Sequence, residues 1–363
     1  MTSRIQDAVT NAMARLKMSD VAGATAVIRN ALIGSGSPYS PTQRPKTAFL
    51  GGQAGRGLGH VLNLLKTRRT GFPPPTARPL TQTSPDDPRF TSRSLTTGAG
   101  SLNYKLYVPE DRDRELALVL MLHGCTQDPD DFARGTQMNR LADEFGLVVA
   151  YPHQPRSANA QGCWNWFDRR HQSAGSGEPA KLSALARALA AEFRIAPERV
   201  FAAGLSAGAA MADILAETYP EVFPKVGLHS GLQCGAAHDV VSAFAAMKGD
   251  GAVRRSGAGG KASRKIIIHG TADPTVHASN GDRLFEAMRS RHHCSTVIIS
   301  EVKSAGKSTM RQTLIDPSGE VLAEHLPIEG AGHAWSGGDR AGSFTDADGP
   351  DASREMVSFF LRP

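Results

Sequence analysis

A serine flanked by two glycines stands at residues 204–208 (Gly-Leu-Ser-Ala-Gly), a spacing that suits nucleophilic catalysis. The largely apolar run 199–203 before it is typical of a buried strand, and residues 209–216 after it are typical of a helix. Between a strand and a helix, Gly-x-Ser-x-Gly forms a sharp turn that holds the serine hydroxyl at its tip. The sequence therefore predicts Ser206 as a nucleophile.

A carboxylate follows this serine in the chain order that α/β-hydrolases use, which is serine, then acid, then histidine. Residues 265–269 read as a buried strand, and Asp273 lies just beyond the end of that strand. Sheets of parallel strands carry their sites at the carboxyl ends of the strands. We therefore expect Asp273 to be the acid that orients a histidine.

The best histidine for a general base is His333, in a glycine-rich loop between the last predicted strand and a C-terminal helix over 352–361. A loop of this kind can bring an imidazole to the serine hydroxyl. The other histidines after Ser206 that we weighed are less suitable, because they share the Asp273 connection, end a charged helix or lie inside a strand: His277, His292, His293 and His325.

An oxyanion hole needs two backbone N–H groups directed at the developing negative charge. Ala207, the residue after the nucleophile, is expected to supply one of them. The other is expected from the loop after the apolar run 116–122, where Gly124 permits a tight turn and either Cys125 or Thr126 presents its N–H.

Several motifs together resemble the polyhydroxybutyrate depolymerase family of esterases, which is related to feruloyl and acetylxylan esterases. They are residues 123–127 (His-Gly-Cys-Thr-Gln), 151–152 (Tyr-Pro), 163–167 (Cys-Trp-Asn-Trp-Phe), 204–208, 269–273 (His-Gly-Thr-Ala-Asp) and 332–335 (Gly-His-Ala-Trp). The resemblance covers residues 98–363 in consistent order. It implies an α/β-hydrolase fold and ester hydrolysis through an acyl-enzyme, with Ser206, Asp273 and His333 as the triad.

On this basis we expect a serine esterase that acts on poly- or oligo(3-hydroxybutyrate) or similar short hydroxyacyl esters. The alternatives are a feruloyl or acetylxylan esterase and an acyltransferase with the same triad. An intact triad argues against a non-catalytic scaffold. The expected partner is an ester substrate, and its predicted contacts are the three tryptophans and two amides of the motif loops: Trp164, Trp166, Trp335, Gln127 and Asn165.

Around these motifs, strands and helices alternate, which predicts an α/β fold with a mostly parallel, doubly wound sheet over residues 90–363. Two short segments, near 90–95 and 102–108, alternate like antiparallel edge strands. Residues 1–35 are predicted to form a helical hairpin, which must dock on the main domain, a second copy in a homo-oligomer or a partner. Residues 36–89 are rich in Pro and Gly and are predicted to form a linker, partly disordered.

Composition limits the remaining possibilities. The 363 residues carry a formal net charge of +6, but the basic residues are scattered, so nucleic-acid binding is not expected. No apolar segment is long enough for a membrane span or a signal peptide, which favours a cytoplasmic protein, whereas many family members are extracellular. The cysteine spacing predicts no metal site, and no cofactor is expected. It leaves open whether Cys125 and Cys163 form a disulfide.

Overall fold

The computed structural model of the protein describes residues 87–251, 262–292, 294–302, 306–307 and 309–362. The predicted helical hairpin over 1–35 lies outside these residues, as does the predicted linker apart from positions 87–89. Oligomerisation through the hairpin therefore stays a prediction. The first strand in the described residues begins at Phe90, and the predicted domain bounds stay a prediction.

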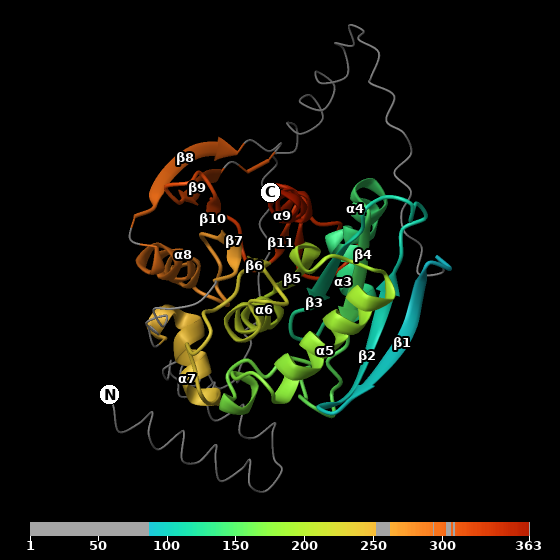
Figure 1. Ribbon diagram of the computed structural model, residues 1–363. Coiled ribbons are helices and arrows are strands. Elements are labelled where there is room, and N and C mark those ends of the chain that lie inside the picture. The colour runs from blue at the N-terminus through green and yellow to red at the C-terminus, as the bar shows by residue number, and fades with distance from the viewer. Residues whose placement is uncertain (1–86, 252–261, 293, 303–305, 308, 363) are drawn as a thin grey trace, which may run out of the picture. The chain divides into compact units, whose positions relative to one another are not determined.

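A ten-stranded sheet forms the centre of the domain, in the order β1-β2-β4-β3-β5-β6-β7-β10-β9-β8 (Figure 1). The strands from β4 to β10 in this order are parallel, and two antiparallel strands extend the sheet on each side. The strands are β1 Phe90–Thr97, β2 Gly100–Tyr107, β3 Ala117–Leu122, β4 Leu147–Pro152, β5 Val200–Leu205, β6 Lys225–His229, β7 Arg264–Gly270, β8 Thr296–Val302, β9 Thr309–Ile315 and β10 Val321–Ile328. A separate pair joins β11 Trp335–Ser336 to β12 Thr345–Asp346.

Helices cover both faces of this sheet (Figure 1). They are α3 Pro129–Thr136, α4 Met138–Phe145, α5 Gly177–Glu192, α6 Ala207–Thr218, α7 Val240–Ala245, α8 Ser279–Arg291 and α9 Ala352–Leu361, with short helical turns at Arg169–His171, Pro197–Arg199 and Ala246–Asp250. None of the helices in the described part of the chain combines the length and the apolar character that a membrane crossing requires.

Two hydrophobic cores lie on the two faces of the sheet, because successive strand residues point to opposite faces. In β3, for example, Leu118 and Leu120 belong to the core under α5, α6 and α8, whereas Val119 and Met121 belong to the core under α3, α4 and α9. This double burial explains why the central strands are apolar at every position rather than alternating.

The predicted doubly wound, mostly parallel architecture is confirmed. The antiparallel pair at the edge is β1 and β2, and the C-terminal helix spans the predicted residues. Strands β8 and β9, which extend the other edge as an antiparallel hairpin, were not predicted from the sequence. The chain leaves β3 for β4 on one side and returns to β5 on the other, so a crevice is expected at the carboxyl ends of β3 and β5.

Candidate active site

Ser206 occupies the turn between β5 and α6, with backbone angles of φ 57° and ψ −117°. A residue with a side chain rarely adopts this conformation, and such strain persists only where surrounding contacts hold it. The Ser206 N–H donates to the carbonyl of His229 at 2.9 Å, and the Ser206 carbonyl accepts from Ala210 N at 2.9 Å. Neighbouring strand and helix thus fix the predicted nucleophile at the tip of a sharp bend.

The two glycines of this turn are required by close backbone contacts. A Cβ at Gly204 would lie 2.4 Å from the carbonyl carbon of Gly208, and a Cβ at Gly208 would lie 2.0 Å from the carbonyl oxygen of Leu122. The turn therefore packs directly on the end of β3. The Gly-x-Ser-x-Gly spacing follows from this packing, since any side chain at either position would collide with backbone.

Asp273 and His333 come together at the same edge of the sheet, as the sequence predicts. His333 Nδ1 lies 2.7 Å from Asp273 Oδ2. The other oxygen, Oδ1, accepts from the N–H groups of Thr275 and Val276 at 2.8 and 2.9 Å. Burial alone would raise the pKa of Asp273, but hydrogen bonds from His269 and His333 hold it well below its usual range. An ionised Asp273 keeps the proton of neutral His333 on Nδ1, which leaves Nε2 as the basic nitrogen.

The loops that carry this pair are tied to each other. Ala272 N donates to the carbonyl of Ala331 at 3.0 Å, and a Cβ at Gly270 would lie 2.3 Å from that same oxygen. The glycine at the end of β7 therefore allows the loop after β10 to approach closely. This contact brings His333 to Asp273 although 60 residues separate them in the chain.

His229, at the end of β6, links the serine turn to the histidine loop and was not predicted as a site residue from the sequence. Its carbonyl accepts from Ser206, while its Nε2 accepts from Ser336 N at 3.0 Å, and its ring stacks on Trp335 with centroids 5.2 Å apart. Burial and the nearby imidazoles of His269 and His333 lower the pKa of His229 to about 3, so the ring is neutral and can accept. The structure contains no hydrogen bond between Ser206 Oγ and His333, and this contact stays a prediction.

The loop after β3 borders Ser206, as an oxyanion loop must. A Cβ at Gly124 would lie 3.7 Å from Ser206 Cβ. Thr126 N donates to the carbonyl of Gln161 at 2.7 Å, so this N–H is already engaged. Among the described residues, Cys125 N and Ala207 N have no acceptor, which leaves them available to an oxyanion. Of the two alternatives in this loop, the geometry favours Cys125.

A disulfide joins Cys125 to Cys163, with Cα atoms 4.2 Å apart. It connects the candidate oxyanion loop to the segment that carries Trp164. A backbone N–H that must stabilise charge has to be held in place, and this covalent link restrains the residue that bears it.

The five predicted substrate contacts lie in these loops, but their side chains are engaged with protein. Trp164 and Trp335 are 1% exposed and Trp166 is 5% exposed. The Gln127 amide accepts from Gly124 N at 3.0 Å and donates to Asp131, and the Asn165 amide donates to Glu178 at 2.6 Å. Their geometry shows that they shape the loops, and direct contact with substrate stays a prediction.

Within the described residues, no group of three or more His, Cys, Asp or Glu side chains is arranged to hold a metal ion. The polar groups at this edge are instead a serine, a hydrogen-bonded pair of histidine and carboxylate, and two backbone N–H groups. This set can activate a hydroxyl as a nucleophile and stabilise an oxyanion.

Comparison with known families identifies the group to which this arrangement belongs. Residues 102–292 match the family described as esterase PHB depolymerase. The chain belongs to this family. The resemblance noted in the motif sequences is thereby confirmed.

Curated relatives of this chain include proteins named as polyester depolymerases and proteins named as acetylxylan esterases. Poly(3-hydroxyalkanoate) depolymerase C of Paucimonas lemoignei is 29% identical over 248 residues, which are 65% of this chain and 59% of that protein. Poly(3-hydroxybutyrate) depolymerase of Ralstonia pickettii is 28% identical over 66% of this chain and 52% of its own length. Acetylxylan esterase A of Talaromyces purpureogenus is 29% identical over 50% of this chain and 51% of its own. The chain thus spans between half and three fifths of these relatives.

The fold has a solved counterpart. The acetyl xylan esterase of Aspergillus awamori superposes with a TM-score of 0.56 at 19% identity, covering 74% of this chain and 98% of that one. Together with the sheet order and the turn at Ser206, this likeness identifies the α/β-hydrolase fold that the sequence predicts.

Proposed function

We propose that the protein hydrolyses carboxylic esters through an acyl-enzyme on Ser206. The observation that carries the proposal is the Asp273–His333 pair at 2.7 Å, held at the same sheet edge as a strained serine turn. Membership of the esterase PHB depolymerase family supports the same reaction.

In the proposed reaction, Ser206 Oγ attacks the ester carbonyl carbon while its proton passes to His333 Nε2. The carbonyl oxygen becomes an oxyanion that accepts hydrogen bonds from Cys125 N and Ala207 N. The bond to the alcohol oxygen then breaks, and the leaving group takes the proton from His333. Water attacks the acyl-enzyme with His333 again as base, and this step releases the acid and restores Ser206.

For the substrate, we propose poly- or oligo(3-hydroxybutyrate) and similar short hydroxyacyl esters. The support is that the curated relatives from Paucimonas and Ralstonia are named as depolymerases of such polyesters. The second candidate is the acetyl ester of xylan, because Talaromyces acetylxylan esterase A matches at the same level of identity.

The reaction and the substrate are tested together with a panel of hydroxybutyrate oligomers, acetylated xylan, feruloyl esters and short-chain esters. The wild-type protein is expected to turn over the oligomers fastest, and Ser206→Ala is expected to lose at least about a thousandfold in kcat. Faster turnover of acetylated xylan would reverse the substrate proposal and keep the reaction. Ester products in the presence of added alcohols would indicate an acyltransferase. Full turnover by correctly folded Ser206→Ala would contradict the reaction itself.

A further inference from the structure

A second buried imidazole faces the candidate triad. His269, in β7, is 1% exposed, and its Nε2 lies 3.5 Å from Asp273 Oδ2, the same oxygen that binds His333. The same Nε2 lies 2.8 Å from the carbonyl oxygen of Val276. Because a carbonyl only accepts, Nε2 must carry a proton, which His269 can then share between Val276 and Asp273.

This donor closes a small ring of contacts around the carboxylate. Val276 N donates to Asp273 Oδ1 at 2.9 Å, and the Val276 carbonyl accepts from His269. The turn from Asp273 to Val276 is therefore fixed by its own backbone on one side and by a side chain of β7 on the other. Removing the imidazole would free both the turn and one face of Oδ2.

A third imidazole stands behind His269. In parallel register His325 of β10 pairs with Ile267, two residues before His269, so both imidazoles lie on the sheet face under α8. A Cβ at Gly281 of α8 would lie 3.0 Å from His325 Nε2 and 3.1 Å from His269 Nδ1. In the described part of the chain, neither nitrogen has a hydrogen-bond partner.

These two nitrogens can be complementary, one as a donor and the other as an acceptor. With its proton on Nε2, neutral His269 presents a lone pair at Nδ1. Burial and the neighbouring His269 lower the pKa of His325 to about 4, so His325 is neutral. Its Nδ1 lies 4.0 Å from Asp282 Oδ1, and its single proton can be on Nδ1 or, facing His269, on Nε2. Gly281 lies against both imidazoles, and Phe285 of α8 stacks on His325 with ring centroids 5.8 Å apart.

We propose that His269 is a positioning residue for the esterase reaction: it donates to Asp273 alongside His333, and His325 supports it across Gly281. The proposal rests on the proposed function, because it assigns a purpose to Asp273. His269 acts through the carboxylate. It sets the orientation of Asp273 and limits how much negative charge Asp273 directs at His333.

The test compares His269→Leu with His269→Gln, whose amide can still donate from about the same place. His238→Gln, an exposed imidazole on another part of the chain, is the matched control. Activity is measured on a soluble ester, per active site titrated with a fluorophosphonate. His269→Leu is expected to lower kcat by about ten- to a hundredfold through misplacement of the pair, with little change in KM. His269→Gln is expected to restore most of the loss.

The pH profile separates positioning from simple stabilisation. The acid limb of kcat/KM reports the pKa of the base in the free enzyme. The titratable side chains near His333 include Asp273, His229 and His269. Without the hydrogen bond from His269, the Asp273 carboxylate attracts the protonated imidazole of His333 more strongly. His269→Leu is therefore expected to move the acid limb of kcat/KM to higher pH by about half a pH unit. In His269→Gln the limb is expected to lie at its wild-type pH.

If His269→Leu does not fold, Gly281→Ala replaces it as the test. Alanine favours helices more than glycine does, so the substitution should not weaken α8 by itself. A loss of kcat with a displaced acid limb would therefore come from the new methyl group pressing on the two imidazoles. The proposal is overturned if either the acid limb or kcat is unchanged in His269→Leu, or in Gly281→Ala where that variant replaces it. It is also overturned if His269→Gln loses as much activity as His269→Leu. Ser206→Ala, run in parallel, shows separately whether the proposed function fails.

Discussion

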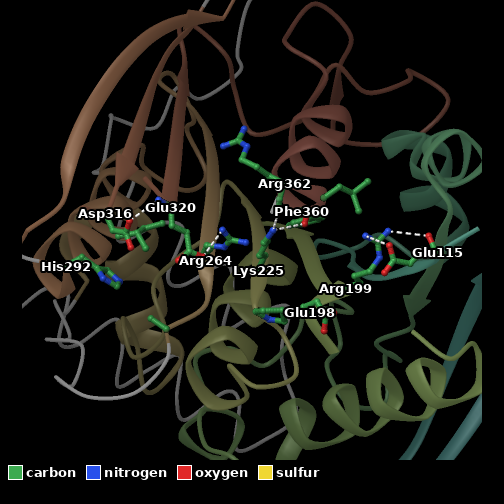
Figure 2. A pocket seen from close by; sticks show the side chains of 14 residues that line it. Glu115, Glu198, Arg199, Lys225, Arg264, His292, Asp316, Glu320, Phe360 and Arg362 are labelled. Carbon is green, nitrogen blue, oxygen red and sulfur yellow. Dashed lines mark hydrogen bonds and ion pairs between the residues drawn. The ribbon is translucent and has the colours of Figure 1, made fainter. Parts of the chain in front are cut away.

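The two ends of the parallel strands use polar residues differently. At the carboxyl ends, Ser206, Asp273 and His333 stand together with two uncommitted N–H groups. At the amino ends lies a cavity of about 480 Å³, lined by charged residues that begin the same strands (Figure 2). There the charges pair among themselves: Arg264 binds Glu320 at 2.9 Å and Arg199 approaches Glu115 at 3.4 Å.

This comparison shows that the size of a cavity does not identify the site. Lys225, at the start of β6, donates to the carbonyls of Phe360 and Arg362 at the end of α9, so its role is to join the C-terminal helix to the sheet (Figure 2). At the carboxyl end of the same strand, His229 joins two loops that bear catalytic candidates. We infer that the amino edge contributes stability and the carboxyl edge contributes chemistry.

The largest effect is expected on turnover, when a residue at the carboxyl edge is substituted. Asp273→Asn would present an amide to His333 Nδ1 and favour the wrong tautomer, so kcat is expected to fall by about 10⁴-fold with the fold intact. Asp316→Asn, at the rim of the amino-edge cavity, is the matched control and should keep wild-type kcat. Steady-state kinetics with circular dichroism measures both, and equal losses in the two variants would abolish the distinction.

The reverse result is expected at the amino edge. Lys225→Met leaves the carbonyls of Phe360 and Arg362 without their donor, at a cost of about 1–3 kcal/mol in the free energy of unfolding. The value of kcat should stay within about twofold of wild type, because the variant leaves every contact of Ser206, Asp273 and His333 in place. Urea unfolding and steady-state kinetics measure the two quantities. A loss of kcat without a loss of stability would mean that the amino edge takes part in catalysis.

A smaller effect is expected from the covalent restraint on the oxyanion loop. The double variant Cys125→Ala/Cys163→Ala frees the N–H of residue 125 and is expected to lower kcat by about tenfold, less than the loss of a donor. Cys294→Ser, an exposed position, is the control. Turnover rates under non-reducing conditions test this prediction, and unchanged kcat in the double variant would show that the loop holds its shape unaided.

The two edges should also titrate in different pH windows. Burial lowers the pKa of His229 to about 3 and of His123 and His325 to about 4, from 6.5. Below 6.5 the unfolded chain binds these protons and the folded one does not, so stability falls as pH drops from about 6.5 to 4, by about 1.4 kcal/mol per pH unit for each histidine. Urea unfolding from pH 7 to 4 measures this, and His325→Phe should flatten the slope.

At the amino edge the window is alkaline. Burial and the charges of Arg264 and Arg362 lower the pKa of Lys225 from 10.5 to about 8. Between pH 8 and 10.5 the unfolded chain binds the proton more than the folded one, so this residue makes stability rise with pH in that range. The difference in free energy of unfolding between wild type and Lys225→Met should therefore change from pH 8 to pH 10. An equal difference at both pH values would contradict a lowered pKa of Lys225.

The sequence predicted the parts of the site that have local signatures. Gly204 and Gly208 mark the turn, because their packing against β3 permits no side chain, and Asp273 follows an apolar strand. The hairpin of β8 and β9 was not predicted, since most of β8 is exposed and shows no alternation of buried and exposed residues. The roles of His229 and His269 also had no local signature, although His269 begins one of the motifs that carry the family resemblance. A histidine at the end of a buried strand becomes meaningful only when neighbouring strands bring its partners to it.

The central claim is that Ser206 is made nucleophilic by His333 at the carboxyl edge. Reaction with a fluorophosphonate, followed by mass spectrometry of the peptide that contains residues 204–208, tests it most directly. We expect rapid modification of Ser206 in the wild-type protein and a labelling rate at least about a thousandfold lower in His333→Ala. An unmodified Ser206, or labelling that is as fast in folded His333→Ala, would contradict the claim.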